Sequence, residues 1–358
     1  MQAATKMNGD FPEGNWQATK ATAIGARSKY MQRYKTSFNL SGLVQFVTLR
    51  VSLGYLFDDA MGLMDQYDSF ENIEYIGRRT NQLWIESKAD EGQRPQWKNE
   101  KRLHKALNAV TTLSLPTKNM PGAFPSTSQE QDPDPLEPRL NPMNLLLPAY
   151  ETMWRVVLRC LLEVRYRNET TSGDWIQALK AYLEKLDDRS ESPGEAFWKA
   201  SDKGVTVIDI VKEALRLYPP SRRIHRAFGD RIEKADIERC QRSQLLGQND
   251  PLVFRPARWQ SICPETRANV FAGQDGSKGN LKKEEEKLGF MPFAFTCTAD
   301  VRDTRGFGMK MIALLVAVLI DGLDDWRLEG QEADEVMENA CPLDTNRHSL
   351  ASLRLDHD

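Results

Sequence analysis

The sequence predicts a mainly α-helical protein with a small β component. Apolar residues recur with helical spacing over most of the chain, whereas short strands are expected only at residues 222–227 and near the C-terminus. At 358 residues, 40% of them hydrophobic, the chain is long enough to bury a sizeable core. We therefore expect a single domain over residues 1–358, without a large sheet.

The first part of the chain is expected to contain amphipathic helices separated by polar breaks. Residues 1–14 are expected to be loose. The apolar run LVQFVTLRVSLGYLF predicts a helix of the core. The helices expected in this part span residues 16–36, 43–65, 69–88 and 98–113.

A proline-rich stretch interrupts the helical pattern in the middle of the chain. Residues 116–142 hold seven prolines and the acidic string QEQDPDP, which predict a long loop or linker. Asn141 then offers an N-cap, and Pro142 stands in the first helical turn, where its missing N–H is not needed. Together they predict the start of a helix that continues to Val164.

The second part of the chain also contains mostly helical patterns. Helices are expected at residues 173–187 and 205–218. Residues 276–287, which include KKEEEK, are expected to form a solvated loop. The apolar run at residues 311–320 is about half the length of a membrane span and predicts a buried helix. Residues 331–358 form the C-terminal segment.

Composition excludes several classes of partner. A net charge of −3 and a pI near 6.0 give no electrostatic reason to expect nucleic acid or an anionic membrane. We see no signal peptide and no membrane span. The five cysteines have no C-x-x-C spacing and their number is odd, which argues against a disulfide framework or structural zinc. We expect a protein of a reducing compartment, cytoplasmic or peripheral at an intracellular membrane, and not secreted.

The string VKEALRLYPPSRRIHR combines a helical ion pair with a stop signal. Glu213 and Arg216 are three residues apart, so they lie on the same face of a helix and are able to form an ion pair. Pro219 and Pro220 end that helix, because proline has no N–H and restricts the residue before it. Taken alone, the pair is commonly a solvated one that contributes a few tenths of a kcal/mol.

In its context this string resembles the K-helix signature of the cytochrome P450 family. Three other stretches resemble segments of that family and occur in its order: LLLPAYETMWRVVLRCLLEV, DPLVFRPARW and LGFMPFAFTCTADVRDTRGFGMKMIALLVAVLI. The resemblance is to fungal-type members and covers residues 14–330. It implies a P450-like helical fold that lacks the family's usual N-terminal region: the membrane anchor, the first helices and most of the first small β-sheet.

The resemblance implies roles for two groups of residues. In the family, a second Arg, here Arg258, closes a structural cluster with Glu213 and Arg216. The long central helix passes over the heme, and its acid–alcohol pair, here Glu151 and Thr152, relays protons during oxygen activation. The family has glycine before the acid, whereas this chain has a tyrosine, whose ring would crowd the oxygen groove. The alternative is that the two residues are ordinary polar residues on the surface of a helix, without a catalytic role.

The resemblance also implies residues that contact heme b. Trp16 and Lys20 resemble the W-x-x-x-R of the family's C helix, where a cation meets a heme propionate, with Lys in place of Arg. Arg222, Arg223, His225 and Arg226 follow the two prolines and are candidates for the propionates as well. Most basic residues in such a position are simply solvated, so only one or two of them need to contact heme.

The heme iron needs a cysteine thiolate as its axial ligand. In the family this cysteine lies in a loop of the form F-x-x-G-x-R-x-C-x-G, and two registers compete here. If Gly306 is the second glycine, the ligand position falls on Thr304, which has no thiolate. If Cys297 is the ligand, Phe290 matches the family's Phe and Ala299 replaces the second glycine. We favour Cys297, because it is the only cysteine of the loop, although a lone cysteine is commonly a buried small hydrophobe.

The function that the resemblance implies is a heme-thiolate monooxygenase of secondary-metabolism type. It would insert one oxygen atom of O₂ into a small organic substrate, with electrons from a separate reductase. The alternative is a degenerate P450-like protein without functional heme, acting as a binding protein or a non-oxidative enzyme, as the altered ligand loop would favour.

A third, weaker alternative comes from the acidic string LFDDAMGLMD. Its residues Asp58, Asp59 and Asp65 suggest the Mg²⁺-diphosphate sites of terpene cyclases. Their spacing is not the usual D-D-x-x-D and no convincing second metal motif follows, so an exposed acidic helix end is the better interpretation.

Overall fold

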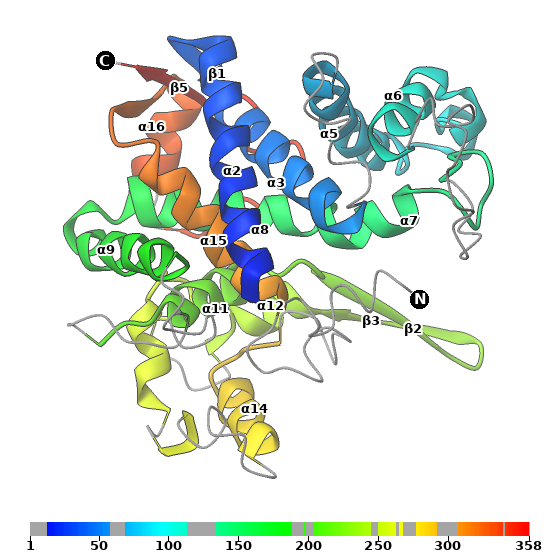
Figure 1. The fold of residues 1–358 in the computed structure, drawn as a ribbon. Helices are drawn as coiled ribbons and strands as arrows, with labels where there is room; N and C mark the ends of the chain where they lie inside the picture. The colour runs from blue at the N-terminus through cyan, green and yellow to red at the C-terminus, as the bar shows by residue number, and fades with distance from the viewer. Residues whose placement is uncertain are drawn as a thin grey trace.

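The computed structural model is mainly helical, with two small antiparallel sheets, as the sequence predicts (Figure 1). Within the part of the chain that it describes, no helix is long and apolar enough to cross a membrane. The described residues are 13–57, 69–112, 133–187, 197, 204–244, 250–262, 265–267, 277–291, 307–338 and 341–357.

Two N-terminal helices pack along each other. Helix α2 (Glu13–Tyr34) contacts α3 (Leu40–Leu56), most of whose residues are buried. Asn39 caps α3, because its side-chain oxygen accepts a hydrogen bond of 2.7 Å from the backbone N–H of Gly42. This cap starts α3 three residues before the predicted position at residue 43.

A second helical pair follows, formed by α5 (Ser69–Glu86) and α6 (Lys101–Thr111). Arg79 fixes the pair, since its guanidinium donates to the carboxylates of Glu86 and Glu100 at 2.5–3.2 Å. Two single 3₁₀ turns lie between the helices, Glu91–Gln93 and Trp97–Asn99.

The central helix is continuous but is widened twice by π turns. Its α-helical parts are α7 (Met143–Leu146) and α8 (Met153–Leu162), and the π turns are Leu147–Glu151 and Glu163–Arg167. Asn141 accepts from the backbone N–H of Met143 at 3.0 Å, close to its predicted role, but the helix begins one residue later than predicted, with Pro142 at the N-cap position. Every residue of α8 is buried, because α3, α11 and α15 pack around it.

Helix α15 (Phe307–Asp321) is apolar on all sides and lies at the centre of the molecule (Figure 1). It contacts α2, α8, α9 (Glu169–Lys185) and α11 (Val207–Leu217). This confirms the buried helix predicted at residues 311–320. A capping box between Thr206 and Asp209 starts α11.

One predicted loop is a helix. Residues 276–287 were expected to be solvated loop, but Ser277–Lys287 form α14. Lysine and glutamate are good helix formers, and Glu285 also pairs with Lys212 of α11. Leu281 is 3% exposed and packs on Trp259. The charged residues KKEEEK therefore belong to a helix, and its one buried leucine gives too weak a hydrophobic pattern to predict it.

The β component is two separate sheets. In the first, β5 (Arg354–His357) lies between β1 (Ser37–Asn39) and β4 (Trp326–Glu329), with Leu355 opposite both Phe38 and Leu328. The second is a hairpin of β2 (Arg223–Phe228) and β3 (Arg231–Asp236) that projects from the helices (Figure 1). Strands were predicted at β2 and near the C-terminus. Strand β1 was not, because three residues carry no alternation. The remaining elements are α12 (Ile237–Gln241), the 3₁₀ turn Pro256–Ser261 and α16 (Gln331–Glu338).

Candidate functional site

Glu213, Arg216 and Arg258 come together in the interior. The Glu213 carboxylate accepts two hydrogen bonds from Arg216, at 2.8 and 3.0 Å, and is contacted by Nε of Arg258 at 3.1 Å. It also accepts from the backbone N–H of Arg255 at 3.0 Å. The side chains of Glu213 and Arg216 are fully buried. The solvated-pair alternative is therefore wrong for this helix.

The rest of the Arg216 guanidinium binds backbone carbonyls. It donates to Gln241 at 3.1 Å, to Pro251 at 2.7 Å and to Val253 at 3.3 Å. Burial lowers the pKa of Arg258, and Glu213 opposes that shift. Helix α11 is thereby tied to the segment at residues 250–258. This is a scaffold contact and offers no reacting group.

The predicted acid–alcohol pair lies at the first π turn of the central helix. Pro148 has no N–H to donate within the helix, and the turn that contains it is a π turn. The Thr152 hydroxyl donates to the carbonyl of Pro148 at 2.9 Å. Glu151 is 2% exposed, and its carboxylate accepts from Nε1 of Trp154 at 3.2 Å. The two predicted side chains are adjacent in the sequence, but they differ in burial and make separate contacts.

The Glu151 carboxylate forms an ion pair with Arg347, from the C-terminal segment. Nε of Arg155 lies 4.0 Å from the same carboxylate. The guanidinium of Arg347 lies over the ring of Trp84 at 4.2 Å. Burial lowers the pKa of Arg347 to about 10, so it remains a cation at neutral pH. Glu151 therefore has a cationic partner rather than an open groove beside it.

Tyr150 stands where the family has glycine. Its ring is buried and its hydroxyl points at Gly77 of α5, where an added Cβ would lie 3.0 Å from the hydroxyl oxygen. Among the described residues this hydroxyl has no hydrogen-bond partner. The ring therefore fills space between the central helix and α5.

Sequence reasoning missed a set of cations around this helix. Arg155 donates to the carbonyl of Pro220 at 3.2 Å, and Arg159 donates to that of Asp344 at 2.5 Å. Burial lowers the pKa of each guanidinium to about 10. The spacing of Glu151 and Arg155, four residues apart on one helix, was a usable signal. Nothing in the sequence indicated that Arg347 would reach the same place.

Trp16 lies at the start of α15, the helix that follows the predicted ligand loop. Its ring is 5.7 Å from that of Phe307, and the Lys310 ammonium lies over it at 5.9 Å. Lys20 points elsewhere: its ammonium donates to the carbonyl of Leu183 at 2.7 Å and to Asp187 at 2.6 Å.

Three of the four other candidates for propionate contact lie on strand β2, whereas the fourth, Arg222, comes directly before it and pairs with Glu238. Arg223, His225 and Arg226 are all exposed. Side chains alternate along a strand, so Arg223 and His225 share one face of the hairpin and Arg226 lies on the other. The nearest carboxylate to Arg223 is Asp236, 3.6 Å from its Nε. These candidates thus belong to a different element from Trp16 and Lys20.

Both alternative ligand residues, Cys297 and Thr304, lie outside the described residues, as do Asp58, Asp59 and Asp65. The chain on either side of the predicted ligand loop is described. On the N-terminal side, the Phe290 ring packs on Trp259 at 5.4 Å. The next residue, Met291, donates its N–H to the side chain of Gln241 at 2.5 Å. On the C-terminal side, Phe307 meets Trp16.

Trp16 and Lys20, both predicted to lie beside a heme, have different surroundings. Trp16 presents an aromatic ring beside the end of the ligand loop, whereas the Lys20 ammonium is already bound to a carboxylate. Within the described part of the chain, no group of three or more His, Cys, Asp or Glu side chains forms a metal site. The described cysteines 160, 240 and 341 are free thiols.

Comparison of the sequence with models of known protein families gives no match, and comparison with curated proteins gives none either. A function for this chain therefore depends on its residues and on the contacts described above.

Proposed function

We propose that this chain is a heme-thiolate monooxygenase of the cytochrome P450 type, with Cys297 as the axial ligand. It would act on a small organic substrate and take electrons from a separate reductase. The observation that supports this most is the buried cluster of Glu213, Arg216 and Arg258. The resemblance implied contacts among these three residues of two separate segments, and the side chains meet in that way.

The positions of three further residues support the same proposal. The acid–alcohol pair Glu151 and Thr152 lies at a π turn, a distortion that is frequent at functional sites. Trp16 packs on the first residue of α15, next to the end of the ligand loop. These two observations support the proposal beside the buried cluster.

A bound heme would supply activation of O₂ and transfer of one oxygen atom to the substrate. Cys297 would hold it from the ligand loop, and one or two of Arg223, His225 and Arg226 would pair with its propionates. In this proposal the half-buried Thr152 hydroxyl, which here donates to the carbonyl of Pro148, would donate a proton. Glu151 would resupply that proton once its carboxylate has separated from Arg347 and has taken up a proton from water.

A second candidate function is favoured by the contacts of Glu151 and Lys20. Both side chains are held by partners within the chain, Arg347 and Asp187. A P450-like scaffold that binds a small molecule, or transforms it without oxidation, needs neither side chain to be available. This candidate keeps the structural cluster and dispenses with the heme.

Heme binding separates the two candidates. The full chain, expressed with added heme precursor, is expected to bind heme stoichiometrically. After reduction, its carbon monoxide complex should show the red-shifted Soret band of a thiolate ligand. Absence of heme in the purified, folded protein would overturn the monooxygenase proposal.

Two substitutions test the choice of ligand. Cys297→Ser should abolish the red-shifted band and leave the fold, while Thr304→Cys in the natural background should change little. The reverse pattern, a silent Cys297→Ser and a band created by Thr304→Cys, would show that the other register is correct. In that case the natural protein would lack a thiolate ligand.

A further inference from the structure

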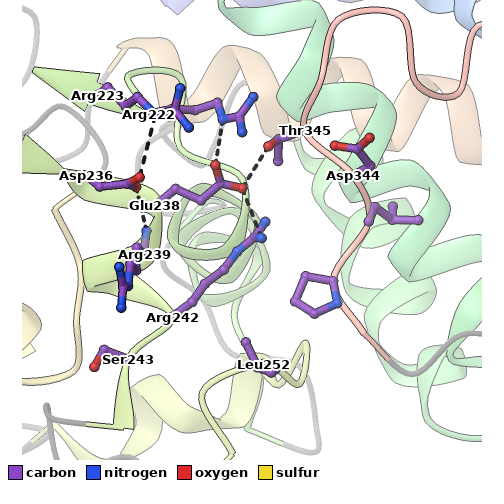
Figure 2. A pocket seen from close by; sticks show the side chains of 12 residues that line it. Arg222, Arg223, Asp236, Glu238, Arg239, Arg242, Ser243, Leu252, Asp344 and Thr345 are labelled. Atoms are coloured by element: carbon purple, nitrogen blue, oxygen red, sulfur yellow. Dashed lines mark hydrogen bonds and ion pairs between the residues drawn. The ribbon is translucent and has the colours of Figure 1, made fainter.

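A groove of about 570 Å³ lies between α12 with the start of β2 on one side and residues 342–345 on the other (Figure 2). This volume is in the range of small-molecule sites, about 300–1,000 Å³. Four arginines and three carboxylates line it, which leaves one net positive charge. The arginines are Arg222, Arg223, Arg239 and Arg242.

Glu238 is fixed between the two walls of the groove. Its carboxylate accepts from Arg222 at 2.5 Å, from Arg242 at 2.9 Å and from the Thr345 hydroxyl at 2.7 Å (Figure 2). Two arginines and one acid therefore serve to hold α12 against the C-terminal segment. Glu238 is 8% exposed and does not offer free negative charge to a ligand.

The other two carboxylates are also engaged. Asp236 caps α12 by accepting from the backbone N–H of Arg239 at 3.0 Å. Asp344 accepts from the backbone N–H and the side-chain amide of Asn346 at 2.9 and 3.0 Å. The acids of the groove thus satisfy donors of the chain itself, and its ligand-facing charge comes from the arginines.

Arg223 and Arg239 keep donors directed to solvent. The Arg223 side chain is 51% exposed, and its nearest carboxylate lies 3.6 Å away. Arg239 is exposed, and within the described part of the chain its guanidinium makes no hydrogen bond or ion pair. Figure 2 shows the two on the same side of the groove, with Asp236 between them.

Two arginines of the groove also act on a neighbouring lysine, Lys88. Burial lowers the pKa of Lys88, and so do the nearby charges of Arg347, Arg222, Arg223 and Arg155, in that order. Cations that lie close together repel one another, and an anion bound among them reduces that repulsion. A divalent or trivalent anion reduces it more than a single carboxylate does.

We propose that this groove binds a small phosphorylated molecule through a diphosphate group. The planar guanidinium groups of Arg223 and Arg239 are suited to bidentate contacts with phosphate oxygens. Two linked phosphates are able to engage both arginines at once. The few apolar side chains of the lining, Leu252, Pro342 and Leu343, would contact the organic part.

The test is isothermal titration calorimetry of the full chain with inorganic pyrophosphate. We expect saturable binding that weakens as salt is added, because exposed charges are screened. Arg239→Gln and Arg223→Gln should each weaken binding about tenfold, as expected for loss of one charge-assisted contact. Arg231→Gln is the matched control, since Arg231 is exposed on the neighbouring strand β3 and does not line the groove. It should leave affinity within about twofold.

Three results would overturn the proposal: no saturable binding at millimolar pyrophosphate, unchanged binding in both groove variants, or citrate binding as tightly as pyrophosphate. The proposal does not require heme. Arg239 is not a candidate for propionate contact, so loss of pyrophosphate binding in Arg239→Gln at unchanged heme content concerns the groove alone.

Discussion

Replacing Glu213 by glutamine is the sharpest test of the buried cluster. The carboxylate receives hydrogen bonds from both guanidinium groups and from the backbone N–H of Arg255. The amide of glutamine keeps the size of the side chain but removes its charge, and its NH₂ group would face another donor. Arg216 has no route to water, because its side chain is fully buried and its other N–H groups bind carbonyls.

The expected cost follows from these contacts. Removing one partner of a buried ion pair costs about 3–5 kcal/mol, because the remaining charge stays desolvated. Unfolding entropy near the melting temperature is about 2.1 cal/mol/K per residue, hence about 0.75 kcal/mol/K for the 358 residues. Glu213→Gln is therefore expected to lower Tm by about 4–7 °C and to reduce the free energy of unfolding by a large part of a typical 5–15 kcal/mol.

The assay is urea and thermal unfolding, followed by circular dichroism. Glu284→Gln is the control, because Glu284 pairs with Lys287 on the exposed side of α14, where ion pairs contribute about 0–1 kcal/mol. Glu213→Gln should shift the urea midpoint far more than Glu284→Gln does. Equal midpoints for wild type and Glu213→Gln would refute the reasoning, since a buried shared carboxylate would then contribute nothing.

Three other predictions concern single contacts. The two bonds from Arg79 hold the pKa of Glu100 below its usual 4.5, so their stabilisation is complete above that pH and is lost as pH falls through the lowered value. Arg79→Gln should accordingly lose less stability than wild type on acidification from neutral pH to pH ~3, and a parallel loss in urea midpoints would contradict this assignment. Tyr150→Phe should raise the free energy of unfolding by about 1 kcal/mol, because it removes a buried hydroxyl without a described partner. It should also make Gly77→Ala less destabilising, since the added Cβ would no longer meet that hydroxyl. A lower urea midpoint for Tyr150→Phe than for wild type would show that the hydroxyl has a partner. Thr152→Ala should keep the free energy of unfolding within about 0.5 kcal/mol of the wild-type value while lowering turnover or coupling of a heme-loaded protein. Unchanged turnover would exclude Thr152 from the proton relay.

Local sequence signals predicted most of the fold. Helix α15 was recognisable because its apolar run is too short for a membrane and too continuous for a surface helix. The start of the central helix was recognisable from Asn141, whose capping contact is local in sequence. Its two π turns were not predicted, because hydrophobic periodicity does not resolve one extra residue in a turn. Helix α14 was missed because its charges hid a single buried leucine.

The site was less predictable than the fold, for a physical reason. The partners of Glu213 were predictable from a family pattern that includes both arginines. The partner of Glu151 was not, since Arg347 belongs to an irregular segment far along the chain. Lys20 was expected to face a propionate, yet tertiary packing brings Asp187 within 2.6 Å. Charged side chains take the nearest available opposite charge, and sequence spacing alone does not tell which one that is.

Arg223 has a role in both proposals: it is one of the candidates for propionate contact and one of the two arginines proposed to bind the diphosphate. Heme propionates and a diphosphate are both anions, and a single guanidinium has only one fork of donors to offer. If the propionates use Arg223, heme-loaded protein should bind pyrophosphate more weakly than heme-free protein, and Arg223→Gln should remove that difference. If they use His225 or Arg226 instead, heme loading should leave pyrophosphate affinity unchanged, because the exposed guanidinium beside Asp236 remains available. The groove would then be a second site on a heme protein. Its ligand would be a candidate regulator of the heme site, or a candidate source of the molecule on which that site acts.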